Sequence, residues 1–397
     1  MTAPLVGPYA TPRRAHRTAR RRDRRVYLRS HPVLFALLAA TRSRPVVRIG
    51  RTVLVHGTDA YREVLTHLPL DRTAEGTTGG AAARLTDGGL LFDQDGAGHR
   101  AARRTLAADL GSGAVARLRP LWQRVLTERL AVLAPDDHSR GPGTGRPGGD
   151  ATVDLVELAR EVAGATTAAL TGCAADPLLL ARTAADAAAA TARDHLPGRR
   201  RPGSADTAAR AAADLTALLP DALDAMVAVA AVNTTVAALP RAAAWCADAG
   251  LWAGLTPATA PALAAELLRL TAPSPILPRV AAADATVAGR PVGRGDRLVL
   301  VARHAAQAQL DTPADPAAAT QAVFGAGPHA CPGAGLARAQ LADFLLALAP
   351  YRPVVVRARV DRRSALPGYA ELRVRAGLPA RTGPPARTGP PGGEDAP

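Results

Sequence analysis

FGAGPHACPGAGLAR, the stretch from Phe324 to Arg338, places a lone cysteine in a glycine-rich loop directly before an alanine- and leucine-rich helical run. The free N–H groups and the positive dipole end of a helix N-terminus would stabilise Cys331 as the thiolate that a metal requires. The loop glycines have no Cβ, so the backbone can pass close to a flat, bulky ligand, and His329 can reach an acidic group on it. The plainer alternative is a buried structural cysteine.

This stretch resembles the haem-binding loop of the cytochrome P450 family, and it fills every fixed position of that signature. The resemblance implies that Cys331 is the axial thiolate ligand of the iron of haem b. It also implies that Phe324, Gly325 and Gly333 shape the cofactor-binding loop and that His329 binds a haem propionate. A thiolate ligand pushes electron density towards the iron and favours cleavage of the O–O bond.

Two further motifs support this resemblance. HRAAR places His99 and Arg103 four residues apart on one helical face, where they suit the carboxylates of a haem. AELLRL places Glu266 and Arg269 within ion-pair reach, and it resembles the structural Glu-x-x-Arg pair of the family. Arg279 then resembles the family's strand arginine that pairs with a propionate. Each of these residues, taken alone, would be read as a solvated surface charge.

AAVNTTV, from Ala230 to Val236, lies in a long helical run. The resemblance implies that this helix crosses the distal face of the haem, with Ala231 leaving room for oxygen. Thr234, with Asn233 before it, would then donate a hydrogen bond to oxygen and relay protons. Thr235 takes that role if the register shifts by one residue. The alternative is that both threonines simply hydrogen-bond to the previous helical turn.

The chain departs from the family pattern in two places. Asn233 fills the usual acid position, and an amide cannot exchange a proton near neutral pH, which leaves room for coupling, desaturation or ring formation. The stretch before the cysteine loop lacks the arginine that meets the Glu-x-x-Arg pair. We expect Arg303 or His304 to take its place, and we expect Ala305–Ala322 to be irregular.

Composition fits a single large helical protein of a reducing compartment. The 397 residues are 48% hydrophobic and only 3% aromatic, and three cysteines make a disulfide framework improbable. The net charge of +15 is concentrated near the start, where nine arginines lie between Arg13 and Arg29. No aromatic residues alternate with these arginines, so we interpret them as a solvated tail and not as a nucleic-acid site.

The sequence predicts a mainly α fold with small β elements, an α+β single domain of cytochrome P450 type with a long helix over the haem. We expect residues 1–26 to be a disordered, dispensable basic arm, 27–376 to be the domain and 377–397 to be a disordered tail. Pro32–Ala40 is predicted as the first helix, and the long helix runs from about Pro220 to Gly250.

The predicted function is that of a cytoplasmic bacterial monooxygenase of secondary metabolism, a monomer with no membrane span and no nucleic-acid partner. It would oxidise a small hydrophobic or natural-product intermediate with O2. A separate ferredoxin and its reductase would supply electrons, with docking at Arg100, Arg104 and Arg338. The alternatives are a haem-thiolate enzyme of non-hydroxylating chemistry, and a lapsed family member that acts as a binding or recruitment module.

Overall fold

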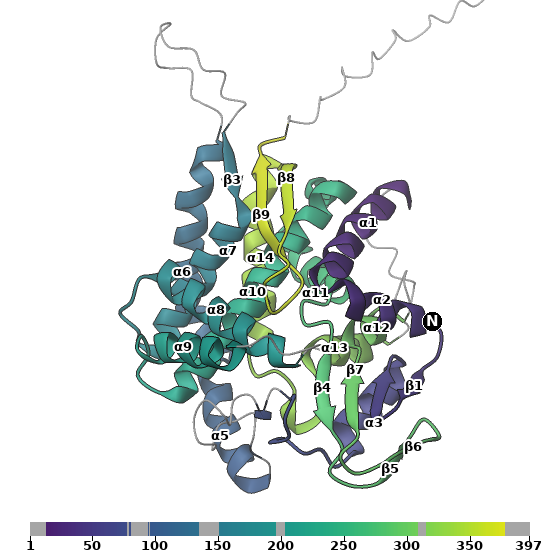
Figure 1. Ribbon diagram of the computed structural model, residues 1–397. Helices are drawn as coiled ribbons and strands as arrows, with labels where there is room; N and C mark the ends of the chain where they lie inside the picture. Colours follow the sequence, from purple (N-terminus) through teal and green to yellow (C-terminus); the bar gives the residue numbers. More distant parts are fainter. Residues whose placement is uncertain are drawn as a thin grey trace, which may run out of the picture.

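Alanine and leucine favour helix, and the structure is built mostly from helices (Figure 1). The computed structural model describes residues 13–77, 79–80, 94, 96–134, 151–195, 203–308 and 315–377. The mainly α prediction is confirmed. The α-helices of this part are α1 (Arg13–Ser30), α2 (Pro32–Thr41), α3 (Thr58–His67), α5 (Gly96–Asp109), α6 (Ser112–Leu130), α7 (Leu155–Thr171), α8 (Pro177–His195), α9 (Ser204–Thr216), α10 (Ala222–Ala249), α11 (Ala260–Thr271), α12 (Ala302–Ala306), α13 (Pro316–Phe324) and α14 (Ala334–Leu348).

Short strands form small sheets at the edges of this helical body (Figure 1). One sheet has the order β1-β2-β7-β4, in which β2 and β7 are parallel and the other pairs antiparallel. A second has the order β3-β9-β8, and β5 pairs with β6. The strands are β1 (Val46–Ile49), β2 (Thr52–Val55), β3 (Thr152–Asp154), β4 (Leu277–Val280), β5 (Ala285–Val287), β6 (Arg290–Val292), β7 (Arg297–Leu300), β8 (Val354–Val360) and β9 (Tyr369–Arg375).

The long helix α10 passes through the middle of the molecule, as the sequence predicts. It begins where the Asp221 side chain accepts a hydrogen bond of 2.8 Å from the backbone N–H of Asp224. It ends at Gly250, whose φ of 67° is a left-handed conformation that glycine adopts without strain. Its length and apolar composition would suffice for a membrane span. Its C-terminal half, however, is packed into the largest hydrophobic cluster of the described residues.

One glycine fixes a close helix crossing beside α10. A Cβ on Gly164 of α7 would lie 1.9 Å from the carbonyl oxygen of Pro177, where α8 begins. No side chain can occupy that space, because the obstacle is backbone. Gly164 therefore allows α7 and α8 to approach closely at this point.

The prediction of a disordered arm is wrong for residues 13–26, which form most of α1. Pro32–Ala40 therefore lies in the second helix of the fold and not in the first. Ala19, Val26 and Tyr27 are buried on one face of α1, while Arg21, Arg24, Arg25 and Arg29 are exposed. Residues 1–12 and 378–397 lie outside the described part of the chain.

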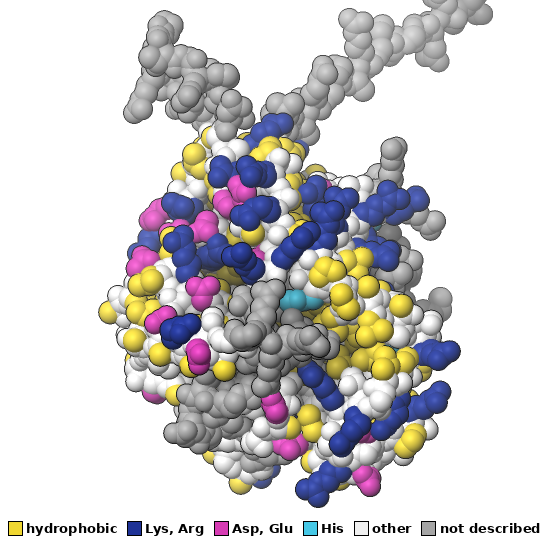
Figure 2. Space-filling view, viewed as in Figure 1, with side chains coloured by type: hydrophobic (Ala, Val, Ile, Leu, Met, Phe, Trp, Pro, Cys, Tyr) yellow, Lys and Arg dark blue, Asp and Glu magenta, His cyan; other side chains and the backbone are white. Residues whose placement is uncertain are grey.

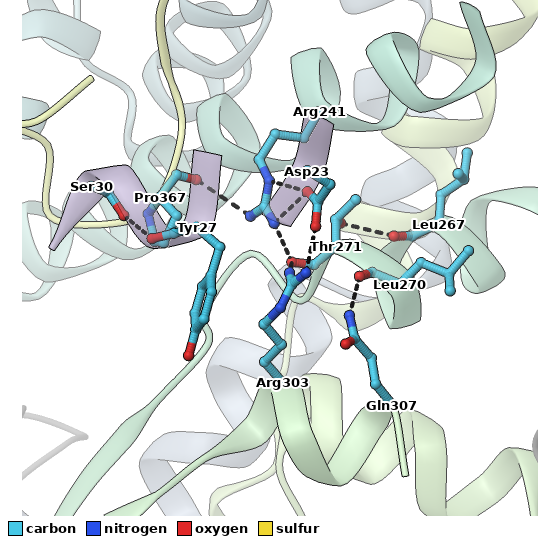
Figure 3. A network of polar contacts seen from close by, with 10 residues as sticks. All are labelled: Asp23, Tyr27, Ser30, Arg241, Leu267, Leu270, Thr271, Arg303, Gln307 and Pro367. Atoms are coloured by element: carbon cyan, nitrogen blue, oxygen red, sulfur yellow. Dashed lines mark hydrogen bonds and ion pairs between the residues drawn. The ribbon is translucent and has the colours of Figure 1, made fainter. Parts of the chain in front are cut away.

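The decisive contact of α1 is a buried carboxylate between two guanidinium groups (Figure 3). Asp23 accepts from Nη2 of Arg241 on α10 at 2.7 Å and from Nη2 of Arg303 on α12 at 2.6 Å. All three side chains are at most 7% exposed. Both arginines also donate to the carbonyl oxygen of Thr271, at the end of α11. The arginine-rich run that suggested a solvated tail therefore contains Asp23, the acid that anchors α1 to the rest of the fold.

We expect Asp23→Ala to destabilise the protein by about 3–5 kcal/mol, because it leaves two buried guanidinium groups without their counter-charge. Arg25→Ala, on the exposed side of the same helix, should change the free energy of unfolding by less than about 0.5 kcal/mol. Urea unfolding followed by circular dichroism measures both. Equal midpoints for the two variants would show that the ion cluster does not hold α1.

The region before the cysteine loop is more regular than predicted. Instead of an irregular stretch over residues 305–322, α12 extends to Ala306 and α13 begins at Pro316. The Asp315 side chain accepts from the backbone N–H groups of Ala317 and Ala318 at 2.9 and 3.0 Å. An N-cap aspartate followed by proline is a helix start signal, and it is present in the sequence as DPAAA. Residues 309–314 lie outside the described part.

A buried histidine pair joins α12 to the end of β2. The Nδ1 atoms of His56 and His304 are 2.9 Å apart, and Oγ1 of Thr41 is 3.0 Å from Nε2 of His56. A hydrogen bond between two ring nitrogens needs one donor and one acceptor, so the contact requires that at least one ring is neutral. Burial, with the nearby charge of Arg42, lowers the pKa of His56 to about 4 and that of His304 to about 3.

This pair should make the protein acid-sensitive. Between about pH 6.5 and pH 4 the unfolded chain binds protons on both rings that the folded chain excludes, so stability falls as the pH falls. Each histidine contributes a slope of up to about 1.4 kcal/mol per pH unit. We expect His56→Gln/His304→Gln to flatten this slope in urea unfolding from pH 7 to pH 4, and exposed His67→Gln to preserve it. An unchanged slope in the double variant would contradict the assignment.

Candidate functional site

The Cys331 loop lies between a 3-10 turn, Gly327–His329, and the start of α14. The backbone N–H of Cys331 donates to the carbonyl oxygen of Phe324 at 2.6 Å, which closes the loop. Gly325 and Gly327 have φ values of 78° and 68°, which other residues adopt only with strain. A Cβ on Gly327 would also lie 3.2 Å from a carbonyl oxygen of α3. Gly325 and Gly327 therefore allow the backbone path of the loop, and Gly327 allows the loop to pack closely against α3.

The surroundings of the Cys331 thiol combine opposing effects on its pKa. Cys331 keeps exposed surface, yet the surrounding protein atoms desolvate the thiol and raise its pKa. A hydrogen bond from the Gly333 backbone and the positive charges of Arg103 and Arg338 act in the opposite direction. Each of these groups stabilises negative charge on sulfur. Burial outweighs these groups, so the pKa of the Cys331 thiol is raised, and the thiolate would form when a metal takes the place of the proton.

Helix α5 brings two of the predicted anion-binding residues to this loop. Arg103 donates from Nη2 to the carbonyl oxygen of Ala330, next to the cysteine. The ring of His99, which is 1% exposed, stacks on the ring of His329 with centroids 4.0 Å apart and planes 25° apart. On the other side, the guanidinium of Arg338 lies 4.7 Å from the centre of the Phe324 ring. The structure thus gathers these predicted residues around Cys331.

Arg279 of β4 is a largely buried cation, and no acid of the described residues contributes to its electrostatic surroundings. Its Nη1 donates to the carbonyl oxygen of Pro278 at 2.8 Å, while its buried Nε has no hydrogen-bond partner. Burial, with the nearby charge of Arg72, lowers the pKa of Arg279 to about 10, and Tyr61 acts weakly in the opposite direction. A buried guanidinium with these neighbours is costly unless an anion binds it. A haem propionate is an anion of the required kind, so the residues present fit that cofactor.

The Glu266–Arg269 pair forms as the sequence predicts. Its guanidinium and carboxylate meet at 2.6 and 2.7 Å, and Arg269 also donates to the carbonyl oxygen of Ala306 at 3.1 Å. The expectation that Arg303 or His304 joins this pair is wrong. Arg303 binds Asp23 and His304 binds His56, so both are committed elsewhere. Within the described residues the pair instead braces the backbone at the end of α12.

On α10, the side chains that we predicted to line the oxygen groove form hydrogen bonds with backbone carbonyl oxygens. Oγ1 of Thr234 donates to the carbonyl oxygen of Ala230 at 2.9 Å and approaches that of Ala231 at 3.4 Å. Nδ2 of Asn233 donates to the carbonyl oxygen of Val229 at 2.7 Å and approaches that of Ala184 on α8 at 3.4 Å. Asn233 therefore links α10 to α8. Among the described residues, no hydrogen bond joins the side chains of Asn233 and Thr234, which were predicted to relay protons together.

The sequence reading missed two polar groups that shape this region. Arg72 lies close enough to Arg279 for its charge to lower the pKa of that guanidinium, and Oη of Tyr61 donates to the carbonyl oxygen of Ala322 in α13. Neither residue belongs to a recognisable motif. The packing of α3 against α13 places Tyr61, and the pairing of Leu70 with Ala281 beside β4 places Arg72, so neither position could be read from local spacing.

Neither a protein-family model nor a curated protein matches the sequence. Solved structures do match, across nearly the whole of their chains. Epothilone B-bound cytochrome P450epoK aligns over 87% of this chain and 96% of its own, with a TM-score of 0.67 at 17% identity. P450BioI in complex with an acyl carrier protein gives 0.66 at 16%, over 88% and 99%. Open cytochrome P450 EryK from S. erythraea gives 0.65 at 19%, over 89% and 98%. The chain has the cytochrome P450 fold.

This result confirms the fold class that the resemblance of the Cys331 loop predicts. At identities of 16–19% the likeness concerns the fold alone. The roles of individual side chains therefore depend on the geometry of this chain. That geometry is clearest around Cys331, where α5, α14 and the glycine-rich turn converge, and around Arg279.

Asn233 provides a test of the α10 geometry. In Asn233→Asp a carboxylate would face the two carbonyl oxygens that now accept from the amide, so the folded state would favour the protonated acid and raise its pKa. The variant should therefore lose stability as the pH rises above about 4, by about 1–3 kcal/mol at neutral pH. Thermal unfolding at pH 4.5 and pH 8 measures this loss. In Asn233→Ala the loss should not depend on pH, and equal pH dependence in both variants would contradict the contact.

Proposed function

We propose that this protein is a haem-thiolate monooxygenase that uses O2 to oxidise a small hydrophobic or natural-product intermediate. The observation that carries the proposal is the Cys331 loop. In that loop an accessible thiol sits before a helix N-terminus, among groups that favour its anion. The cytochrome P450 fold supports it. When bound, haem b would supply the reduction of O2 and the transfer of one oxygen atom.

The chain's own residues would hold and orient that cofactor. Sγ of Cys331 would ligate the iron, with the backbone N–H of Gly333 donating to it. His99, Arg103 and His329 lie on one side of the loop, and the buried Nε of Arg279 offers a further cationic donor. Together they would neutralise two propionates through charge-assisted hydrogen bonds. Phe324 and Gly325 keep the loop path that leaves the thiol accessible.

On the distal side, α10 would supply the oxygen groove. Ala231 is small, and Oγ1 of Thr234 can turn from the Ala230 carbonyl oxygen to donate to a bound ligand, because a threonine hydroxyl rotates freely. Thr235, whose side chain makes no hydrogen bond among the described residues, remains the alternative by a shift of one position. Proton delivery would use water, since the Asn233 amide cannot carry a proton.

Electrons would come from a separate ferredoxin and its reductase. Arg100 and Arg104 are exposed on α5, beside the Arg103 that contacts the cysteine loop, and Arg338 lies on the first turns of α14. An acidic ferredoxin would be steered to this surface by opposite charge. The substrate could be free or carrier-bound. Among proteins of the same fold, one structure holds epothilone B and another an acyl carrier protein ligated to hexadec-9Z-enoic acid.

Asn233 favours a second candidate function, a haem-thiolate enzyme of coupling, desaturation or cyclisation. Its amide is engaged with carbonyl oxygens of α10 and α8, so the usual acid position contributes no titratable group. A reaction in which a substrate group or water delivers the proton would tolerate this arrangement. Product analysis with a ferredoxin system distinguishes the two candidates.

The proposal predicts thiolate ligation by Cys331. The reduced protein with carbon monoxide should show the strongly red-shifted Soret band of a haem thiolate, and Cys331→Ala should lose that band. Cys173→Ala removes a half-buried cysteine whose thiol binds the Leu218 carbonyl oxygen, and it should keep the band. A wild-type protein without the band, or a Cys331→Ala variant that retains it, would overturn the proposal.

Arg279→Leu should weaken haem retention by about 10- to 150-fold, which corresponds to one charge-assisted contact of about 1.5–3 kcal/mol. The haem-free variant should be at least as stable as the haem-free wild type, because an uncompensated buried charge has been removed. Haem transfer to apomyoglobin and urea unfolding of the apoprotein measure the two effects. Arg290→Leu, exposed on β6, serves as the control. Equal retention by both variants would show that Arg279 does not bind the cofactor.

A further inference from the structure

The outer face of α2 is entirely apolar. The helix buries Leu34, Phe35 and Leu38, yet Val33 is 85% exposed and Leu37 is 41% exposed. No polar side chain interrupts the exposed face, which consists of Pro32, Val33, Ala36, Leu37 and Ala40. Such a face is unfavourable in water, and a surface patch of this kind marks a contact with another apolar phase.

Arginines border this apolar face at both ends. Between residues 13 and 57 the sequence holds 13 arginines and a single acid, Asp23, which is buried. Figure 2 shows basic side chains gathered over α1 and a hydrophobic area directly beside them. The exposed arginines on α1 and just after α2 include Arg21, Arg24, Arg25, Arg29, Arg42 and Arg44.

These positive charges are crowded. Burial lowers the pKa of Arg42, and the charges of Arg303, Arg20 and Arg24 lower it further, so α1 and the end of α2 share one positive field. Arg22 and Arg42 are partly engaged within the protein, because Arg22 pairs with Asp248 and Nη2 of Arg42 donates to the carbonyl oxygen of Gln307 at 2.9 Å. Like charges held together on a surface repel one another, and an anionic partner relieves that repulsion.

We propose that the α1–α2 face, residues 16–44, is a peripheral contact surface for an anionic lipid bilayer. The apolar side of α2 would enter the boundary between headgroups and acyl chains. The exposed arginines of α1, together with Arg42 and Arg44, would contact the lipid phosphates. This is the arrangement of a helix that lies in the interface plane and does not cross the bilayer. It adds a location to the proposed function and does not depend on haem chemistry.

A bilayer suits this surface better than an acidic protein does. The exposed large hydrophobic residues of α2 are aliphatic, and the face offers no aromatic anchor and no hydrogen-bonding group for a specific protein partner. A fluid acyl phase needs neither. The rim of arginines is spread along two successive helices, which matches a continuous sheet of phosphates.

The test is flotation of the full-length protein with vesicles of phosphatidylcholine alone or with 30% phosphatidylglycerol, at physiological ionic strength. We expect binding only to the anionic vesicles. Val33→Asp/Leu37→Asp should reduce the partition coefficient at least tenfold, and Arg24→Glu/Arg29→Glu should do the same. Both variants change exposed side chains, and unchanged circular dichroism verifies their fold.

Matched controls separate this surface from the general positive charge of the chain. Val132→Asp/Leu179→Asp alters equally exposed hydrophobics elsewhere, and Arg117→Glu/Arg124→Glu makes the same charge change on α6. Both controls should bind like the wild type. No flotation of the wild type, or equal loss in the controls, would overturn the proposal. Binding to polyglutamate that matches the vesicle binding and shows the same variant sensitivity would also overturn it, in favour of an acidic protein partner.

Discussion

A buried guanidinium needs an anion, and this requirement organises the structure. Arginine remains charged at any pH that the folded protein experiences, so burial cannot be relieved by loss of a proton as it can for lysine. Arg241 and Arg303 share the carboxylate of Asp23, and Arg269 has that of Glu266. Within the described part of the chain no carboxylate acts on Arg279, so its guanidinium is the one for which we propose a haem propionate as partner.

The Asp23 cluster connects elements that the cofactor loop depends on. It fixes α1 against α10, and through Arg303 it fixes α12, whose last carbonyl oxygen is held by Arg269. From there α13 leads directly into the Cys331 loop. A single carboxylate in the first helix thus helps to place the backbone on which the thiol sits, although it is far from that loop in sequence.

Local patterns predicted what local forces decide. The glycine-rich cysteine loop, the Glu266–Arg269 spacing and the long apolar helix are each contained within a few turns, and the structure has them. The DPAAA start of α13 was equally local and was overlooked. The position of α1 could not be predicted in this way. A run of arginines reads as solvated unless the partners of Asp23 are known, and those lie 218 and 280 residues away.

The separation between Asp23 and its partners also has a consequence for folding during synthesis. The first helix leaves the ribosome long before Arg303 exists, so α1 must wait, with its carboxylate unpaired, until most of the chain has been made. Closing so long a loop is slow, and the ion pairs of Asp23 stabilise it only when Arg241 of α10 and Arg303 of α12 are both in place. We therefore expect the N-terminal helix to dock last, after the helices α10 and α12 that it contacts.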